Sequence, residues 1–175
     1  YVHEESSDLS KRLMAQSIDE GFDTVLDGTG DSGYQKLAGK VQKARQQGAN
    51  KVVAEYVTVD TDEALRRAIK RGQETGRDVP EDVIRKTHEQ VSRVFPEAAE
   101  NNLFDELRLY DTNGDTPVLI YEKIGDTERI LDPVKYEKFL RKNPDYTPQQ
   151  PYMSLPPRTA DDLSYGIKDT QGLFT

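Results

Sequence analysis

The sequence predicts an α/β fold in which a parallel sheet is flanked by helices and followed by a C-terminal β-hairpin. Short apolar runs rich in β-branched residues alternate along the chain with longer segments of helical periodicity. This alternation is typical of strand–helix–strand units, whose connections place the strands parallel. Further along, two apolar runs flank the pair Asn113-Gly114, which is a hairpin signal.

The first 60 residues are predicted to alternate between helices and strands. Apolar residues recur every three or four positions in the two helical segments, and a glycine suited to a helix C-cap follows each of them. The strand segments are short and apolar, and the second is rich in β-branched residues. In chain order the elements are a helix at 5–20, a strand at 22–27 (FDTVLD), a helix at 34–47 and a strand at 51–60.

The next 80 residues continue the pattern and then turn into a hairpin. Asp60 or Thr61 can cap a helix, and Pro80 and Pro96 each favour a helix start because proline suits the first turn. The expected elements are a helix at 61–73, a loop at 74–80, a helix from Pro80 to about Arg93, a short helix from Pro96, hairpin strands at 106–111 and 117–123, and a helix at 133–141.

The composition changes after Lys142. Five of the nine prolines fall in residues 143–175. A proline-rich stretch of this kind favours an extended chain over a second packed core. We therefore expect one α/β domain at 1–142 and an extended tail at 143–175.

Composition and charge exclude several classes of protein. The chain has no cysteine and two histidines, so disulfides and thiolate metal sites are impossible and a zinc site is not expected. The net charge of -8 argues against general nucleic-acid binding, which needs clustered Lys and Arg. No apolar run approaches the roughly 20 residues that span a bilayer, and the first residues lack the features of a signal peptide. We expect a cytoplasmic protein that binds neither nucleic acid nor membrane.

A glycine-rich loop follows the predicted strand at 22–27. Asp27 ends the apolar run and Gly28, Thr29 and Gly30 follow it directly. One interpretation is an ordinary turn in which the glycines supply positive φ. The other is a ligand-binding loop at the carboxyl end of a strand, where open α/β sheets place their sites.

A cluster of positive charge lies within residues 64–86, where the bases outnumber the acids in an otherwise acidic protein. The cluster suggests a site for a compact anion such as a phosphate group. The alternative is a solvated helix with ion pairs between successive turns. Arg77 is less easily explained this way because it lies in a glycine-containing loop, as the lid arginines of nucleotide kinases do.

Five segments in succession resemble the zeta toxin family of bacterial and phage P-loop kinases. They are YVHEESSDLSKRL, TVLDGTGD, VTVDTDEALRRAIKR, TGRDVPEDVIRKTHEQV and NLFDELRLYDTNGD. The resemblance runs from Tyr1 to about Lys123 and implies a partial P-loop kinase-like sheet.

The resemblance also implies an activity and a set of residues. Zeta toxins transfer the γ-phosphoryl group of ATP, with Mg²⁺, to UDP-N-acetylglucosamine, and a helical antitoxin usually blocks them. The resemblance places substrate binding on Asp27, Gly28, Thr29 and Gly30, with Ser6 close to the substrate. It places catalytic lid arginines on Arg77 and on Arg71, for which Arg67 is an alternative.

One required motif is missing from the printed sequence. No segment matches the phosphate-binding pattern G-x-x-x-x-G-K-[ST], because the nearest approach, 33–41, has one spacer too many and ends on Val41. We expect the first strand, the phosphate loop and the catalytic Asp to precede Tyr1 in the intact protein, leaving apolar sheet edges exposed here. The alternative is a non-catalytic structural or interaction module of a larger assembly, such as a phage particle, that docks through the tail.

Overall fold

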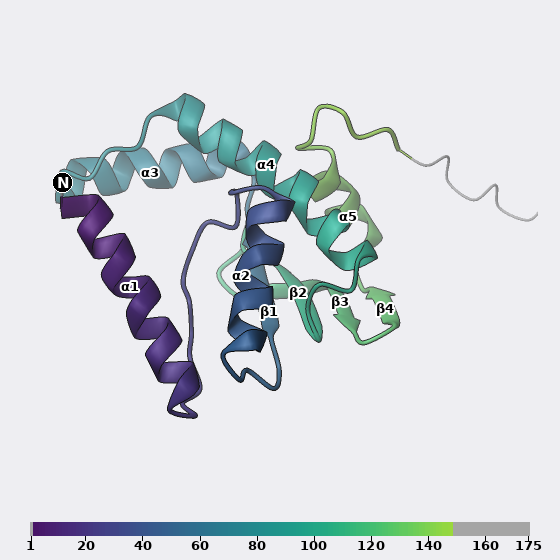
Figure 1. Ribbon diagram of the computed structural model, residues 1–175. Helices are drawn as coiled ribbons and strands as arrows, with labels where there is room; N and C mark the ends of the chain where they lie inside the picture. The colour runs from purple at the N-terminus through teal and green to yellow at the C-terminus, as the bar shows by residue number, and fades with distance from the viewer. Residues whose placement is uncertain (1, 149–175) are drawn as a thin grey trace, which may run out of the picture.

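The structure is a computed structural model that describes residues 2–148, with side chains from residue 5 onward. Within this part, five helices and four strands follow one another along the chain (Figure 1). The elements are α1 (Val2–Asp19), α2 (Tyr34–Gln46), β1 (Val53–Thr58), α3 (Thr61–Thr75), α4 (Glu81–Glu100), β2 (Glu106–Asp111), β3 (Val118–Ile124), β4 (Thr127–Ile130) and α5 (Pro133–Leu140).

The strands form one mixed sheet in the order β1-β2-β3-β4. β1 and β2 are parallel, with Val53 opposite Glu106 and Thr58 opposite Asp111. β3 and β4 continue the sheet in antiparallel fashion. The crossover from β1 to β2 through α3 and α4 is the strand–helix–strand unit that the sequence predicts, and the α/β class is consistent with a P-loop kinase-like fold.

The core lies between the sheet and the helices α4 and α5. Phe95 of α4 is at its centre, with its ring fully buried and 5.1 to 5.4 Å from the rings of Tyr56, Tyr121 and Phe139, all edge-on. Such edge-to-face contacts suit the aromatic quadrupole and add to the gain from burial. The cluster therefore joins β1, β3, α4 and α5 into one packed unit.

Charged residues from all four strands form a ladder across the sheet. The Arg108 guanidinium on β2 donates to Glu122 on β3 at 3.1 Å and lies 3.5 Å from Glu55 on β1. Arg129 on β4 extends the row to Glu122. Cross-strand pairs of opposite charge stabilise a sheet modestly, so these ion pairs support the strand register.

The predicted strand at 22–27 is wrong. The segment lies in the chain's path between α1 and α2 but joins no sheet ladder, and Val25 is 95% exposed. β1, which would be its nearest partner, pairs within the described residues with β2 alone. An apolar run becomes a strand only when a neighbouring strand accepts its hydrogen bonds, and here a pocket separates the two segments.

The predicted break before Pro96 is also wrong, because α4 continues through the proline to Glu100. Proline removes one helical hydrogen bond and usually bends or ends a helix. Here Phe95, Ala98 and Ala99 on either side of it are buried against the sheet. Burial of one continuous apolar face therefore outweighs the local preference.

The hairpin is confirmed, but its connection is longer than a two-residue turn. β2 and β3 are joined by residues 112–117, and Gly114 does not adopt the positive φ of a type I′ turn. After β3, Gly125 with φ of 55° turns the chain into β4, which the sequence analysis did not predict. β4 is exposed along its whole length and so lacks the apolar alternation that would reveal it.

The chain beyond α5 continues to contact the domain. Residues 143–148 form no helix or strand, yet Tyr146 donates a hydrogen bond to Glu137 and Asp145 pairs with Arg93. The rest of the predicted tail, with the residues expected to dock on a partner, lies outside the described residues. Among residues 2–148, no helix has both the length and the apolar character needed to cross a bilayer.

Candidate functional site

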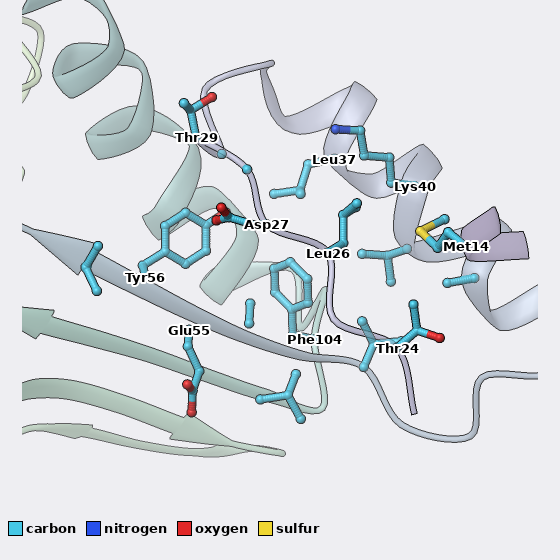
Figure 2. Close-up of a pocket in the computed structure, with 18 of the residues that line it drawn as sticks. Met14, Thr24, Leu26, Asp27, Thr29, Leu37, Lys40, Glu55, Tyr56 and Phe104 are labelled. Atoms are coloured by element: carbon cyan, nitrogen blue, oxygen red, sulfur yellow. The ribbon is translucent and has the colours of Figure 1, made fainter. Parts of the chain in front are cut away.

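A pocket of about 930 Å³ opens between β1 and the segment at 21–30. α2 and the C-terminal part of α1 line it as well, through residues that include Leu37 and Met14 (Figure 2). The pocket extends to Thr58 and Thr112, at the carboxyl ends of the parallel strands β1 and β2. This is the edge at which open α/β sheets bind their ligands.

The glycine-rich loop lines this pocket with all four of its residues, Asp27, Gly28, Thr29 and Gly30. In Figure 2 the segment that carries Leu26, Asp27 and Thr29 runs between the strand of Tyr56 and the helix of Lys40. The Asp27 side chain is exposed and makes no hydrogen bond to the described residues. Its carboxylate therefore remains available as a hydrogen-bond acceptor for a ligand.

Gly30 needs to be a glycine in this loop. Its φ is 72°, in the left-handed region that other residues seldom occupy. A Cβ atom at this position would lie 2.8 Å from Cε1 of Tyr56, so the loop backbone packs directly on the tyrosine ring. The turn interpretation is thus correct for Gly30 and is compatible with a binding role for the loop as a whole.

Asp31, directly after the loop, connects it to α4. Thr29 Oγ1 donates to Asp31 Oδ1 at 2.6 Å, and Thr87 Oγ1 on α4 donates to Oδ2 at 2.9 Å. The hydrogen bond from Thr29 is the main cause that holds the pKa of Asp31 below its ordinary value. The Thr87 hydrogen bond and the charge of Lys40 act in the same direction, while burial opposes them.

A second polar cluster lies where the pocket reaches the end of β1. Lys142 Nζ donates to Thr58 Oγ1 at 2.7 Å and to the Val59 carbonyl, and it lies 3.4 Å from Nδ1 of His88. Burial lowers the pKa of Lys142 to about 8. Burial, together with this lysine, lowers the pKa of His88 to about 4, so His88 is neutral at pH 7. Both side chains already have protein partners and serve to fix the end of the sheet.

The predicted lid arginines lie away from the pocket wall. Arg71 is exposed near the C-terminal end of α3, and Arg77 is exposed in the loop between α3 and α4. Gly76, with φ of 71°, ends α3 and directs the chain into this loop. Ser6 is exposed on α1 and is not among the residues that line the pocket. The structure therefore brings together only the four loop residues of the predicted site.

Ion pairs account for much of the positive cluster. Arg66 and Arg67 pair with Glu63, Lys70 with Glu74, and Arg85 with Glu81, as expected of solvated helices. Arg67 also donates to the Thr112 carbonyl, so its guanidinium has a structural role. Arg71 and Arg77 form no ion pair within residues 5–148, in contrast to Arg67.

Several residues of the site were not found from the sequence. Tyr56 lies on β1, Thr87 on α4 and Lys142 just after α5, so only the fold brings them to the pocket that the glycine-rich loop lines. Asp31 was not predicted either, although it directly follows DGTG in the sequence. Lys40 lines the pocket from α2 and had no distinguishing signal.

The described residues contain no group of three or more His, Asp or Glu side chains that could hold a metal ion. The acids around the pocket are spread along the loop and the strand ends. A resident metal site of the kind that uses a cage of protein ligands is therefore not formed by residues 5–148.

A family model described as Zeta toxin matches residues 1–124 of the chain. The match covers α1 to β3 and thus includes the glycine-rich loop, the pocket and both candidate arginines. No curated protein and no solved structure gives a significant match to the chain.

Proposed function

Because the chain belongs to the zeta toxin family, which is P-loop kinase-like, we propose that it is the sugar-nucleotide-binding and lid portion of a kinase. In the proposed reaction a hydroxyl group of UDP-N-acetylglucosamine attacks the γ-phosphorus of ATP. The bond from that phosphorus to the bridging oxygen breaks, ADP leaves, and the proton of the attacking hydroxyl passes to a general base of the intact protein. This chain contributes positioning and charge, which supply most of the catalysis in phosphoryl transfer.

The observation that carries the proposal is the position of the glycine-rich loop. Its four residues line a pocket of about 930 Å³ at the carboxyl edge of the sheet. A pocket of this size can hold a ligand of nucleotide dimensions. The exposed Asp27 carboxylate can accept hydrogen bonds from sugar hydroxyl groups, and Lys40 on the opposite wall supplies a positive charge near a diphosphate.

The candidate lid supports the same proposal. Arg71 and Arg77 lie on the end of α3 and on the loop that follows, and neither is engaged in an ion pair within residues 5–148. A loop between two helices can move without disturbing the sheet, and its arginines can then reach the transferring phosphoryl group. We propose that they stabilise the charge that develops there in the transition state.

The phosphate-binding loop of such a kinase is not among these 175 residues. The sheet leaves room for it, because within the described part β1 has a strand partner on one side only and the pocket borders its other side. A further parallel strand at that edge would deliver a phosphate loop to the carboxyl edge of the sheet. ATP and Mg²⁺ are therefore proposed as cofactors of the intact protein.

Binding of the sugar nucleotide tests the role of the loop. In the intact protein, Asp27→Asn should weaken binding of UDP-N-acetylglucosamine by about 1–3 kcal/mol, the effect of an unmatched polar contact. Calorimetry measures the affinity, and Asp115→Asn in the exposed β2–β3 connection is the matched control. Equal affinities for the two variants would remove Asp27 from the site.

Turnover tests the lid. Arg77→Ala should lower the rate of ATP-dependent phosphorylation by about 10²-fold or more, because the arginine acts on charge present only in the transition state. Arg66→Ala is the control, since Arg66 is an exposed helix arginine that pairs only with Glu63 within the described residues. A variant Arg77→Ala that turns over as fast as Arg66→Ala would contradict the proposed lid.

The absence of a phosphate-binding motif also favours a second candidate, a non-catalytic interaction module of a larger assembly. An activity assay on the protein encoded by the whole open reading frame distinguishes the two candidates. If that protein phosphorylates a sugar nucleotide, the kinase is supported. Lack of turnover, together with stable association with a neighbouring subunit or an antitoxin, supports the module.

A further inference from the structure

The carboxylate of Asp31 receives two hydroxyl hydrogen bonds from different parts of the fold. Thr29 Oγ1 donates to one carboxylate oxygen at 2.6 Å. Thr87 Oγ1, which lies 56 residues after Asp31 in the chain, donates to the other oxygen at 2.9 Å. The direction of both bonds is determined, since an ionised carboxylate can only accept. Asp31 thus connects the glycine-rich loop to the middle of α4.

The first bond determines what Thr29 can offer to a ligand. A threonine hydroxyl has one proton to donate and two lone pairs that can accept. Thr29 lines the pocket while its proton is directed to Asp31, so its oxygen presents only lone pairs to a bound molecule. Asp27 in the same loop is likewise an acceptor, so the loop offers acceptors from two side chains.

The second bond holds the loop in place. Gly30 packs on the Tyr56 ring of β1, and Asp31 is tied to Thr87 of α4, so the loop is fixed against two separate elements. α4 begins directly after the loop that carries Arg77. The same helix therefore supports the glycine-rich loop and anchors one end of the candidate lid.

We propose that Asp31 is a positioning residue that orients the Thr29 hydroxyl so that the glycine-rich loop selects ligand groups that donate hydrogen bonds. The favoured groups are sugar hydroxyls and amide N–H groups. Phosphate oxygens, which only accept, are disfavoured at this loop and are expected to bind elsewhere in the pocket. The inference rests on the proposed function for the identity of the ligand, but the loop geometry does not depend on it.

Backbone order parameters measured by NMR without ligand test the geometry alone. In Asp31→Asn and Thr87→Val, the order parameters of residues 27–31 should fall below their wild-type values, as expected when a hydrogen bond that anchors the loop is lost. Thr87→Ser keeps the hydroxyl and should restore the wild-type values. Asp115→Asn is the matched control, and unchanged order parameters in both Asp31→Asn and Thr87→Val would overturn the inference.

Ligand selectivity tests the orientation of Thr29. The probes are UDP-N-acetylglucosamine and analogues in which one sugar hydroxyl at a time is replaced by fluorine, which cannot donate. In the intact wild-type protein at least one analogue should bind about tenfold more weakly than the parent, the effect of one unmatched acceptor. In Asp31→Asn the difference should shrink for at least one analogue, because the asparagine amide can donate to Thr29 and free its proton for the ligand, while discrimination that comes from Asp27 should remain.

The outcomes separate this inference from the proposed function. If the wild-type protein binds none of the probes, the proposed function is overturned, and so is the claim about which ligand groups the loop selects. A wild type that binds the parent and all analogues equally overturns the inference alone. So does an Asp31→Asn variant that still discriminates among the analogues as the wild type does.

Discussion

Two halves of this molecule differ in how their apolar residues are used. In the half formed by β2, β3, α4 and α5, large side chains such as Phe95 and Leu109 are fully buried. In the half formed by α1 and residues 22–33, Leu9, Leu13 and Val25 are mainly exposed. Both halves have sequences with regular apolar patterns, so pattern alone does not determine burial.

The difference separates the part of the chain that forms a buried core from the part that borders the pocket. The packed half contains the buried core cluster, and its stability is expected to come from burial. The open half borders the pocket, and the family match includes it fully. Two of its exposed apolar residues, Phe22 and Leu26, line the proposed ligand site, where a bound molecule or a further strand would cover them.

The largest expected effect is in the packed half. Phe95→Ala should lower the free energy of unfolding by about 3–5 kcal/mol, because it removes a fully buried ring that contacts several other aromatic rings. Leu26→Ala removes a side chain that is 54% exposed and should lower the free energy of unfolding by only about 0.5 kcal/mol. Urea unfolding measures both, and similar losses would mean that the two halves are not distinct.

A smaller effect is expected where the halves meet, at the glycine-rich loop. Gly30→Ala should cost about 1–3 kcal/mol, since the residue has positive φ and its Cβ would approach the Tyr56 ring to 2.8 Å. Gly28→Ala is the matched control, because a Cβ there meets nothing within 4 Å. Gly30→Ala should also weaken sugar-nucleotide binding, which calorimetry can follow. Equal thermal stability of the two variants would show that the loop does not rest on Tyr56.

The smallest effect is a pH dependence at the end of β1. Burial and the nearby Lys142 lower the pKa of His88 to about 4, whereas the unfolded value is near 6.5. As the pH falls from 6.5 towards 4, the unfolded state therefore binds a proton that the native state does not, and stability falls. Because His88 is only half-buried, solvent screening reduces the loss to about 1–2 kcal/mol.

The variant His88→Gln should remove this dependence, because glutamine does not titrate and its amide can still hydrogen-bond to Thr61. Unfolding in urea at several pH values between 4.5 and 7.5 measures the slope for both proteins. A slope of the same size in His88→Gln would assign the dependence to other groups.

Most of the fold could be predicted from the sequence where local signals and tertiary contacts agree. The hairpin strands β2 and β3 and the helix α5 were predicted where buried apolar residues lie, whereas β1 was predicted although its Val53 and Val57 are exposed. The segment at 22–27 failed because a strand requires a neighbour that its own sequence does not specify. The break at Pro96 failed for the opposite reason, since buried neighbours keep the helix continuous.

The candidate site was predictable only where its residues are adjacent in the sequence. Asp27, Gly28, Thr29 and Gly30 form one loop, and the structure places them together on the pocket wall. Tyr56 and Thr87, which hold this loop, come from distant elements and carry no local signal. The roles of Ser6, Arg71 and Arg77 stay predictions, because their exposed side chains do not line the pocket.

Hydrogen exchange of the intact protein with and without UDP-N-acetylglucosamine tests the central claim most directly. Bound ligand should slow amide exchange over the glycine-rich loop and the facing residues of β1 and α2, while β2, β3 and α5 stay unchanged because their hydrogen bonds are already protected. Protection confined to the segments that line the pocket is the result that the account predicts. Unchanged exchange at residues 27–31 under saturating ligand would contradict it.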